Sequence, residues 1–376
     1  MYSSPKTGSC LLFVIATLWA CSSESPAPGS PPANGGGGGQ TSNGGGGAGN
    51  SGGALGGGGA GGTATGGGGG STAGAGGAGG SSGSGGSGGT ADAYSCAPGM
   101  EGDGLHEQAE PYGRPPEAYP VDGVAQGTVT PLTPFVSTLY EQHEFGYRVY
   151  VPAGYDASVP VGLMVVPDGP SHYMGTTDAK YYVQHVLDNL IAAGDVPPTI
   201  ALLIDTCMTP CEDQRVSTFD NPDDKYTRFL TDEIIPDVIL ANYSVIMDRD
   251  AWTTVGYSGG GMQAFAAAWY KPELFGKVIT HNASFPAGTA NGLNFLTLIQ
   301  AEGASKGLRV SLVSGTNDLS DQRGNWLEVN TAIANALIAN GEQVRMMSGT
   351  GGHYPPEQAA ADFPNAMRWM FSGCVQ

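Results

Sequence analysis

The segment Trp252-Thr253-Thr254-Val255-Gly256-Tyr257-Ser258-Gly259-Gly260 decides the fold. Its first four residues have the pattern of a short buried strand, and residues 256–260 match G-x-S-x-G. The residues from 259 to 270 then have a helical pattern that ends before Pro272. A tight strand-to-helix turn exposes the oxygen of its serine, and small flanking residues avoid clashes there. We therefore predict that Ser258 is a nucleophile; the alternative is a serine that only caps a packing helix.

The same five-residue pattern occurs twice more, at 49–53 and at 85–89. Both copies lie in a stretch made almost wholly of Gly, Ser, Ala, Thr and Asn, with no strand before them and no helix after them. Only the copy around Ser258 has the strand and helix that the chemistry requires.

Strands and helices are predicted to alternate on both sides of this turn. The further strands are expected at 145–151, 161–166, 199–204, 278–281, 309–314 and 344–347, and the further helices at 182–193, 226–242, 326–339 and 359–370. Residues 92–130 are rich in Pro, Gly and Glu and are expected to be irregular. This alternation predicts the α/β class, with a mostly parallel central sheet and helices on both faces.

A serine hydroxyl needs a base, and the base needs an acid that orients it. On this fold the acid and the histidine follow the serine in the chain, each after a later strand. Asp318 follows the strand expected at 309–314, and His353 ends a Gly-rich loop after the strand at 344–347. We predict Asp318 as the acid and His353 as the base, with Asp321 as the reserve candidate for the acid.

Ligands bind beyond the carboxyl ends of the strands in such sheets. The oxyanion hole is expected to use the backbone N–H of Gly259 with that of Gly169 or Ser171, since Pro170 has no N–H. Polar or aromatic residues in the loops on this face are candidates for substrate binding, although a structural role is equally open for each. They are Asp168, Arg215, His281 and Trp326.

Three parts of the chain differ sharply in composition. Residues 1–21 contain Lys6 and an apolar run at 11–20 that is too short to span a bilayer, which is typical of a signal peptide. Leu18-Trp19-Ala20-Cys21 resembles the lipobox of bacterial lipoproteins, which implies lipidation of Cys21; an ordinary secretory signal is the alternative. Residues 22–90 are predicted to be a disordered Gly/Ser-rich tether, and residues 91–376 a single domain.

The net charge and the cysteines indicate which partners and which cellular compartment to expect. The net charge of −19 argues against nucleic acid as a partner and against a basic patch for lipid, which leaves the lipid anchor as the expected membrane contact. Beyond Cys10 and Cys21, four cysteines remain. We predict the disulfides Cys207–Cys211 and Cys96–Cys374, because export favours oxidation. A Cys-x3-Cys metal site is not favoured, since no further ligand lies at suitable spacing.

These motifs resemble the esterase family of α/β hydrolases that includes enterochelin, feruloyl and acetylxylan esterases. The resemblance covers about 125–372 and rests on Pro167-Asp168-Gly169, Gly256-Tyr257-Ser258-Gly259-Gly260, Pro272-Glu273-Leu274-Phe275, Gly315-Thr316-Asn317-Asp318 and Gly351-Gly352-His353. It implies ester hydrolysis without a cofactor, on a small-molecule or polysaccharide ester. Gly259 departs from the family, which commonly has Met at that position.

The sequence thus predicts an exported serine esterase held on the bacterial cell envelope, or secreted. The ester is expected to be carbohydrate-linked, phenolic or of the siderophore type. Two other functions stay open: acyl transfer on the same fold, and non-catalytic binding at the cell surface.

Overall fold

A computed structural model describes residues 95–96, 103–174, 181–208, 212–287, 294–372 and 374–375. All of them belong to one compact unit, residues 83–376. The predicted signal peptide, Cys21 and the predicted tether lie outside the described residues. Within the described part, no helix has the length and apolar character needed to cross a membrane.

A ten-stranded sheet forms the centre of this unit. Its strands are β2 (Gly104–Glu107), β3 (Thr128–Val129), β4 (Thr133–Ser137), β5 (His143–Val151), β6 (Gly162–Pro167), β7 (Thr199–Asp205), β8 (Trp252–Tyr257), β9 (Lys277–His281), β10 (Arg309–Asn317) and β13 (Gln343–Gly352). Their order is β2-β13-β10-β9-β8-β6-β7-β5-β3, and β4 pairs with β5. All pairings from β2 to β7 are parallel, whereas β5 pairs antiparallel with β7, β3 and β4. The prediction of a mostly parallel sheet is confirmed.

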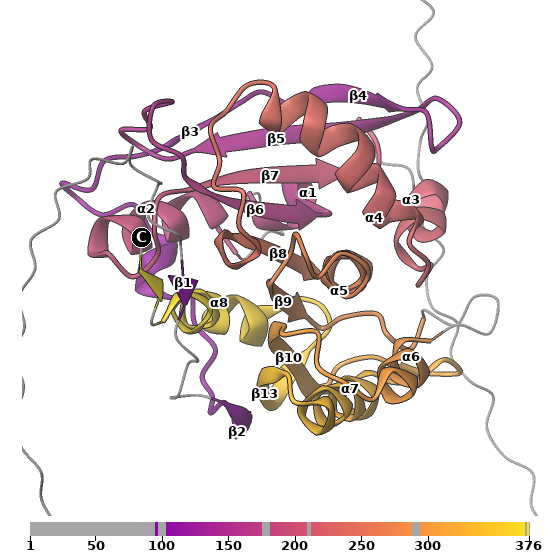
Figure 1. Cartoon of the computed structure of the whole chain (residues 1–376). Coiled ribbons are helices and arrows are strands. Elements are labelled where there is room, and N and C mark those ends of the chain that lie inside the picture. Colours follow the sequence, from indigo (N-terminus) through magenta and orange to yellow (C-terminus); the bar gives the residue numbers. More distant parts are fainter. Residues whose placement is uncertain are drawn as a thin grey trace, which may run out of the picture. The chain divides into compact units, whose positions relative to one another are not determined.

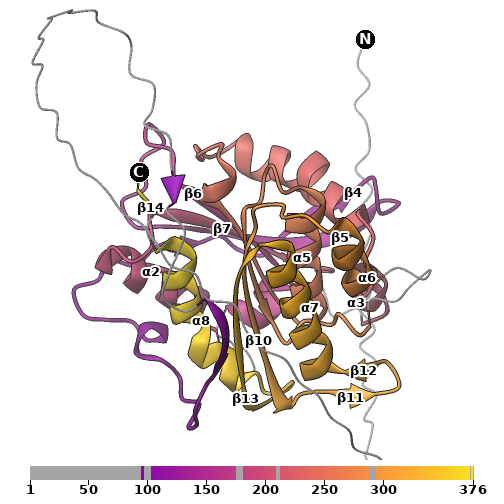
Figure 2. The same cartoon turned by 60° about the horizontal axis from the view of Figure 1, so that its bottom comes forward.

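Helices cover both faces of the sheet. They are α1 (Gly169–Tyr173), α2 (Val183–Ala193), α3 (Glu212–Phe219), α4 (Lys225–Arg228), α5 (Gly259–Tyr270), α6 (Phe295–Glu302), α7 (Trp326–Asn340) and α8 (Glu357–Phe371). Figures 1 and 2 show α2 and α8 on one face, and α5, α6 and α7 on the other. The strands β6 and β8 at the centre are buried along their whole length, which explains their continuous apolar character.

The helix predicted at 226–242 differs in form from the prediction. The α-helix α4 runs directly into η2 (Phe229–Leu240), a π-helical segment that contains Pro236. Proline has no N–H to donate within a helix, and its ring crowds the preceding turn. The wider backbone turn of the π-helix accommodates it.

The prediction that residues 92–130 are irregular is only partly right, because short strands and a short 3-10 helix form there. The strand β2 forms there, at the edge of the sheet, parallel to β13. Its four residues alternate between half-buried and exposed, with Leu105 48% exposed. Such a weak local pattern cannot reveal a strand whose partner lies more than 200 residues further along the chain.

The ends of the domain meet in a short ladder. The strand β1 (Ser95–Cys96) pairs antiparallel with β14 (Cys374–Val375), and Cys96 lies opposite Cys374. This register agrees with the predicted Cys96–Cys374 disulfide, which stays a prediction. Cys207 is disulfide-bonded, and its predicted partner Cys211 lies outside the described residues.

One buried ion pair joins β13 to α8. The guanidinium of Arg345 contacts the carboxylate of Asp362 at 2.7 and 2.6 Å, and Ser311 Oγ lies 3.3 Å from the same guanidinium. The two charged side chains are only 8% and 2% exposed. The pair therefore fixes the strand that leads into the loop of His353.

We expect Asp362→Ala to lower the free energy of unfolding by about 3–5 kcal/mol, because it leaves the Arg345 charge buried without its partner. The control is Asp321→Ala, which breaks a more exposed pair with Arg323 and should lower the free energy of unfolding much less. Urea unfolding followed by tryptophan fluorescence measures both values. Equal losses in the two variants would contradict the structural role given to Arg345 and Asp362.

Candidate active site

Ser258 lies at a sharp turn between β8 and α5. Its backbone has φ 56° and ψ −124°, a combination that side-chain-bearing residues seldom adopt. A Cβ at Gly256 would lie 2.1 Å from the carbonyl oxygen of Gly260, and one at Gly260 would lie 2.6 Å from that of Pro167. These two positions of the predicted G-x-S-x-G-G segment therefore require glycine.

Backbone hydrogen bonds hold Ser258 in this conformation. Its N–H donates to the carbonyl oxygen of His281 at 2.9 Å. Its own carbonyl oxygen accepts from the N–H groups of Ser284 at 2.9 Å and Met262 at 3.1 Å. The strained turn is thus supported by β9, by the residues after β9, and by α5.

The structure brings Ser258, His353 and Asp318 together. His353 Nε2 lies 2.9 Å from Ser258 Oγ, and His353 Nδ1 lies 2.7 Å from Asp318 Oδ1. The side chain of His353 is 13% exposed and that of Asp318 is 1% exposed, while Ser258 is 8% exposed, so the serine and the histidine are the more accessible members of the group. Each residue follows a parallel strand whose carboxyl end is at the same edge of the sheet.

Four donors surround the carboxylate of Asp318. Oδ1 accepts from His353 and from the N–H of Leu319 at 2.8 Å; Oδ2 accepts from Ser314 Oγ at 2.7 Å and from Asn282 Nδ2 at 2.8 Å. Burial by itself raises the pKa of Asp318, but the hydrogen bonds outweigh it and hold the pKa below its ordinary value. Asp318 is therefore an ionised acceptor at neutral pH.

Asp321, the reserve candidate, lies elsewhere. It belongs to a small hairpin formed by β11 (Ser320–Asp321) and β12 (Gly324–Asn325), where its carboxylate pairs with Arg323 at 2.6 Å. That carboxylate makes no hydrogen bond to His353 among the described contacts.

Asn282 is a site residue that the sequence analysis missed. It has φ 49°, in the left-handed region that Asn tolerates better than most residues. Its side chain donates to Asp318 Oδ2 and lies 3.4 Å from the carbonyl oxygen of Gly352, directly before His353. Its position as a polar residue immediately after the buried strand β9 could have marked Asn282 as a candidate site residue in the sequence.

Of the predicted oxyanion donors, Ser171 is already engaged, because its N–H donates to Asp205 Oδ1 at 3.2 Å. Gly259 and Gly169 are the first residues of α5 and α1, where helix N–H groups have no partner within the helix. A Cβ at Gly259 would lie 2.9 Å from both Asp220 Oδ1 and Phe219 Cβ. The end of α3 thus fills the space that a side chain would need at this position.

Asp168 and Arg215 form one unit at the edge of the site. The buried carboxylate of Asp168 accepts from Arg215 Nε at 2.8 Å and from its terminal nitrogen at 2.5 Å, and His172 Nε2 lies 3.1 Å away. Burial opposes ionisation of Asp168, but His172 and Arg215 outweigh it and lower its pKa. The two predicted binding residues therefore bind each other.

The other two candidates are fully buried. The Trp326 ring packs edge-on against His353, with 6.0 Å between the centroids. His281 is enclosed by aromatic rings, its Nδ1 lies 2.8 Å from Tyr173 Oη, and burial lowers its pKa to about 3. Its neutral ring supports the core under the site. The prediction that His281 and Trp326 line the pocket disagrees with the full burial of both side chains.

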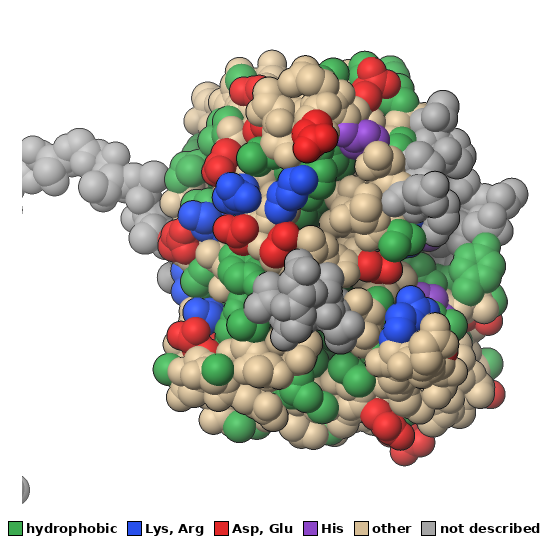
Figure 3. All heavy atoms as spheres, turned by 90° about the vertical axis from the view of Figure 1, so that its right-hand side faces the viewer, with side chains coloured by type: hydrophobic (Ala, Val, Ile, Leu, Met, Phe, Trp, Pro, Cys, Tyr) green, Lys and Arg blue, Asp and Glu red, His purple; other side chains and the backbone are tan. Residues whose placement is uncertain are grey.

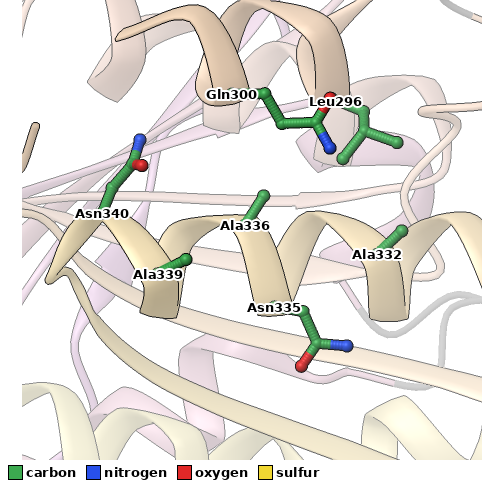
Figure 4. Close-up of a pocket in the computed structure, with 7 residues that line it drawn as sticks. All are labelled: Leu296, Gln300, Ala332, Asn335, Ala336, Ala339 and Asn340. Carbon is green, nitrogen blue, oxygen red and sulfur yellow. The ribbon is translucent and has the colours of Figure 1, made fainter. Parts of the chain in front are cut away.

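Figure 3 shows the side of the molecule where β6 and β7 end; acidic, basic and histidine side chains lie there among hydrophobic ones. A groove of about 530 Å3 lies between α6 and α7 (Figure 4), and none of its lining residues belongs to the Ser258 site.

Among the described residues, no cluster of His, Cys, Asp or Glu side chains could hold a metal ion.

A family model described as "Putative esterase" matches residues 139–369. The chain belongs to this esterase family. The family prediction from the sequence is therefore confirmed, and the match spans β5 to α8 with Ser258, Asp318 and His353 inside it.

Solved structures of esterases share the fold. An enterobactin esterase from Shigella flexneri, determined with enterobactin, has a TM-score of 0.54 and 20% identity over 69% of this chain and 62% of its own. A ferric enterobactin esterase from Salmonella typhimurium has a TM-score of 0.55 and 18% identity, over 69% and 61%. A ferulic acid esterase from Anaeromyces mucronatus has a TM-score of 0.50 and 17% identity, over 67% and 93%. The chain thus spans about three fifths of the length of the enterobactin esterases.

One curated protein, a carbamate kinase from Giardia intestinalis, is 26% identical over 126 residues, which is 31% of this chain and 39% of that protein. So short a match gives no information about the activity of the esterase domain.

Asp205 gives the site a pH-dependent charge. It ends β7 beside Asp168, and burial together with the Asp168 charge raises its pKa to about 7. The folded state therefore favours the neutral carboxyl, and the stability that this proton contributes is lost as the pH rises from the ordinary Asp value towards about 7.

We expect Asp205→Asn to be more stable than the unmodified protein at pH 8, by at most about 4 kcal/mol, since each pKa unit corresponds to about 1.4 kcal/mol. The asparagine keeps the acceptor for the Ser171 N–H. The difference should shrink below pH 7 and vanish near pH 4. Urea unfolding between pH 4 and pH 8 measures it, with Asp122→Asn at an exposed position as the control. A stability difference that does not change with pH would contradict the raised pKa of Asp205.

Proposed function

We propose that this esterase-family protein hydrolyses carboxylic esters with Ser258 as the nucleophile, His353 as the general base and Asp318 as the orienting acid. The observation that carries the proposal is the continuous series of hydrogen bonds from Ser258 Oγ to His353 and from His353 to Asp318, 2.9 and 2.7 Å long. The strained backbone at Ser258 places its oxygen at the start of this series.

The proton positions follow from Asp318. Because its carboxylate is ionised and accepts at every contact, His353 Nδ1 donates to it, and His353 Nε2 is the nitrogen that accepts the serine proton. His353 takes the proton of Ser258 as its oxygen attacks the ester carbonyl, and then passes that proton to the departing alcohol. The acyl group is left on Ser258.

Water completes the cycle. His353 removes a proton from a water molecule, the water oxygen attacks the acyl carbon, and the same proton returns to Ser258 Oγ as the acid leaves. In both halves a negative oxygen forms on the carbonyl carbon. The N–H groups of Gly259 and Gly169, at the starts of α5 and α1, are the proposed donors to it.

The proposed substrates are phenolic, carbohydrate-linked or siderophore-type esters. Support comes from the shared fold of the enterobactin and ferulic acid esterases. Tyr354, directly after His353, is 61% exposed, and an exposed aromatic ring there suits stacking on a phenolic acyl group. An acyl acceptor other than water would turn the same acyl-enzyme into a transferase, so product partition with a sugar present separates the two activities.

We expect Ser258→Ala to reduce hydrolysis of acetyl and feruloyl p-nitrophenyl esters by at least about 1,000-fold, and Asp318→Asn by about 1,000- to 10,000-fold. Asp321→Asn is the matched control: the same substitution three residues further on, at an exposed carboxylate paired with Arg323. It should retain the unmodified rate. Release of p-nitrophenol measures all three proteins. If Ser258→Ala kept full activity, the proposal would fail. If Asp321→Asn lost activity and Asp318→Asn did not, Asp321 would be the acid in place of Asp318.

We propose in addition that the domain is exported and held on the cell envelope through a lipid on Cys21, with 22–90 as its tether. The apolar run before Cys21 and the composition of the tether support this proposal. The disulfides Cys207–Cys211 and Cys96–Cys374 belong to the same proposal, since an oxidising compartment allows them to form.

Cys21→Ser should move the protein from the membrane fraction to the soluble fraction, because a lipoprotein needs the thiol for its acyl chains. Expression in a bacterial host, followed by fractionation and labelling with a radioactive fatty acid, measures the change. Cys10→Ser is the control and should leave the label in place. A Cys21→Ser protein that still takes up the fatty acid would contradict the anchor.

A further inference from the structure

A second hydroxyl touches the proposed nucleophile. Ser284 lies three residues beyond the end of β9, is 5% exposed, and places its Oγ 3.1 Å from Ser258 Oγ. Its backbone N–H also donates to the carbonyl oxygen of Ser258 at 2.9 Å. Ser284 therefore contacts Ser258 twice, once through the backbone and once through the side chain. The sequence analysis assigned it no role.

Proton accounting sets the direction of the side-chain bond. Asp318 is an acceptor, so His353 Nδ1 donates to it and Nε2 accepts. The single hydroxyl hydrogen of Ser258 must then point to Nε2, 2.9 Å away. Ser258 Oγ has no second hydrogen for Ser284. In the bond between the two serines, Ser284 is consequently the donor.

The segment that carries Ser284 is firmly placed. Asn282 contacts Asp318 through its side chain, and its N–H donates to the carbonyl oxygen of Val313 at 2.8 Å. The carbonyl oxygen of Ala283 accepts from the buried side chain of Asn330 at 3.0 Å. Three consecutive residues, 282–284, are thus hydrogen-bonded to β10, to α7 and to the turn at Ser258. The hydroxyl of Ser284 is preorganised before any substrate binds.

We propose that Ser284 is a catalytic residue that donates a hydrogen bond to Ser258 Oγ throughout the reaction. This inference rests on the proposed function and names a fourth side chain in it. With one lone pair of Oγ occupied by Ser284 and the hydrogen directed to His353, the remaining lone pair is free to attack the ester carbonyl.

The bond matters most where Oγ carries negative charge. Charge develops on Oγ when its proton moves to His353 during acylation, and again when the bond between Oγ and the acyl carbon breaks during deacylation. Ser284 keeps its own proton in both steps, and His353 still performs every proton transfer. A hydrogen bond to a charged partner is stronger than one to a neutral partner, so Ser284 stabilises these transition states more than the resting enzyme.

The test compares variants that differ only in the hydroxyl. Ser284→Ala keeps the backbone N–H bond to Ser258 and loses the side-chain bond. Ser284→Thr and Ser284→Val are nearly identical in shape, and only the threonine has a hydroxyl. Ser311→Ala is the control: it removes another buried hydroxyl, on β10, that does not contact Ser258.

Two rates are measured for each variant. The first is the second-order rate constant for inactivation by a fluorophosphonate, which measures the reactivity of Ser258 even when the natural substrate is unknown. The second is kcat for p-nitrophenyl acetate. We expect Ser284→Ala to lower both by roughly 10- to 100-fold, with KM changed less than about two-fold. Both rates of Ser284→Thr should be at least about ten-fold higher than those of Ser284→Val. Both rates of Ser311→Ala should equal those of the unmodified protein. Melting temperatures confirm that each variant is folded.

The outcomes separate this inference from the proposed function. Activity that survives Ser258→Ala would remove the proposed function, whatever Ser284 does. If Ser258 is required but Ser284→Ala reacts within two-fold of the unmodified protein, the role of Ser284 is refuted. Equal rates for the threonine and valine variants would refute it as well, because shape alone would then explain the loss. The comparison of the threonine and valine variants also tests the role of Ser284 if the alanine variant is unstable.

Discussion

The sharp turn at Ser258 is the constraint on which the rest of the site depends. A residue with a side chain at φ 56° costs of the order of 1–3 kcal/mol unless its surroundings enforce that conformation. Here Gly256 and Gly260 allow the backbone of β8, the start of α5 and the end of β6 to come into contact. The N–H of Ser258 is then bound by β9. The cost of the turn is met by packing at the centre of the sheet, where β8 is fully buried.

Parallel strands explain how distant residues meet at this turn. β9, β10 and β13 lie beside β8 in that order, and all of them end at the same edge of the sheet. β9 leads to Asn282 and Ser284, β10 to Asp318, and β13 to His353. Each strand therefore contributes its polar group from the first few residues after its end. Small shifts of one strand would alter several of these contacts together.

The helix α3 forms one border of the site. The end of α3 occupies the space next to Gly259, so a larger side chain there would collide with Phe219 and Asp220. Asp168 is held by Arg215 of α3 and by His172 of α1. The same helix therefore contacts the start of α5 at Gly259 and, through Arg215, the residue that precedes α1. Phe219 and Arg215 of α3 thus form part of the border of the Ser258 site.

The sequence by itself determined the strand-turn-helix around Ser258, most of the parallel strands, and the order of Ser258, Asp318 and His353, because these features depend on short-range patterns and on chain direction. It favoured Asp318 but left Asp321 open as a reserve, since both follow the same strand closely. Only the tertiary structure shows that the first carboxylate meets His353 while the second pairs with Arg323. The burial of His281, the pairing of β2 with β13 and the contact between Ser284 and Ser258 also required the tertiary structure. Each depends on which residues from distant parts of the chain pack together, and no local pattern encodes that.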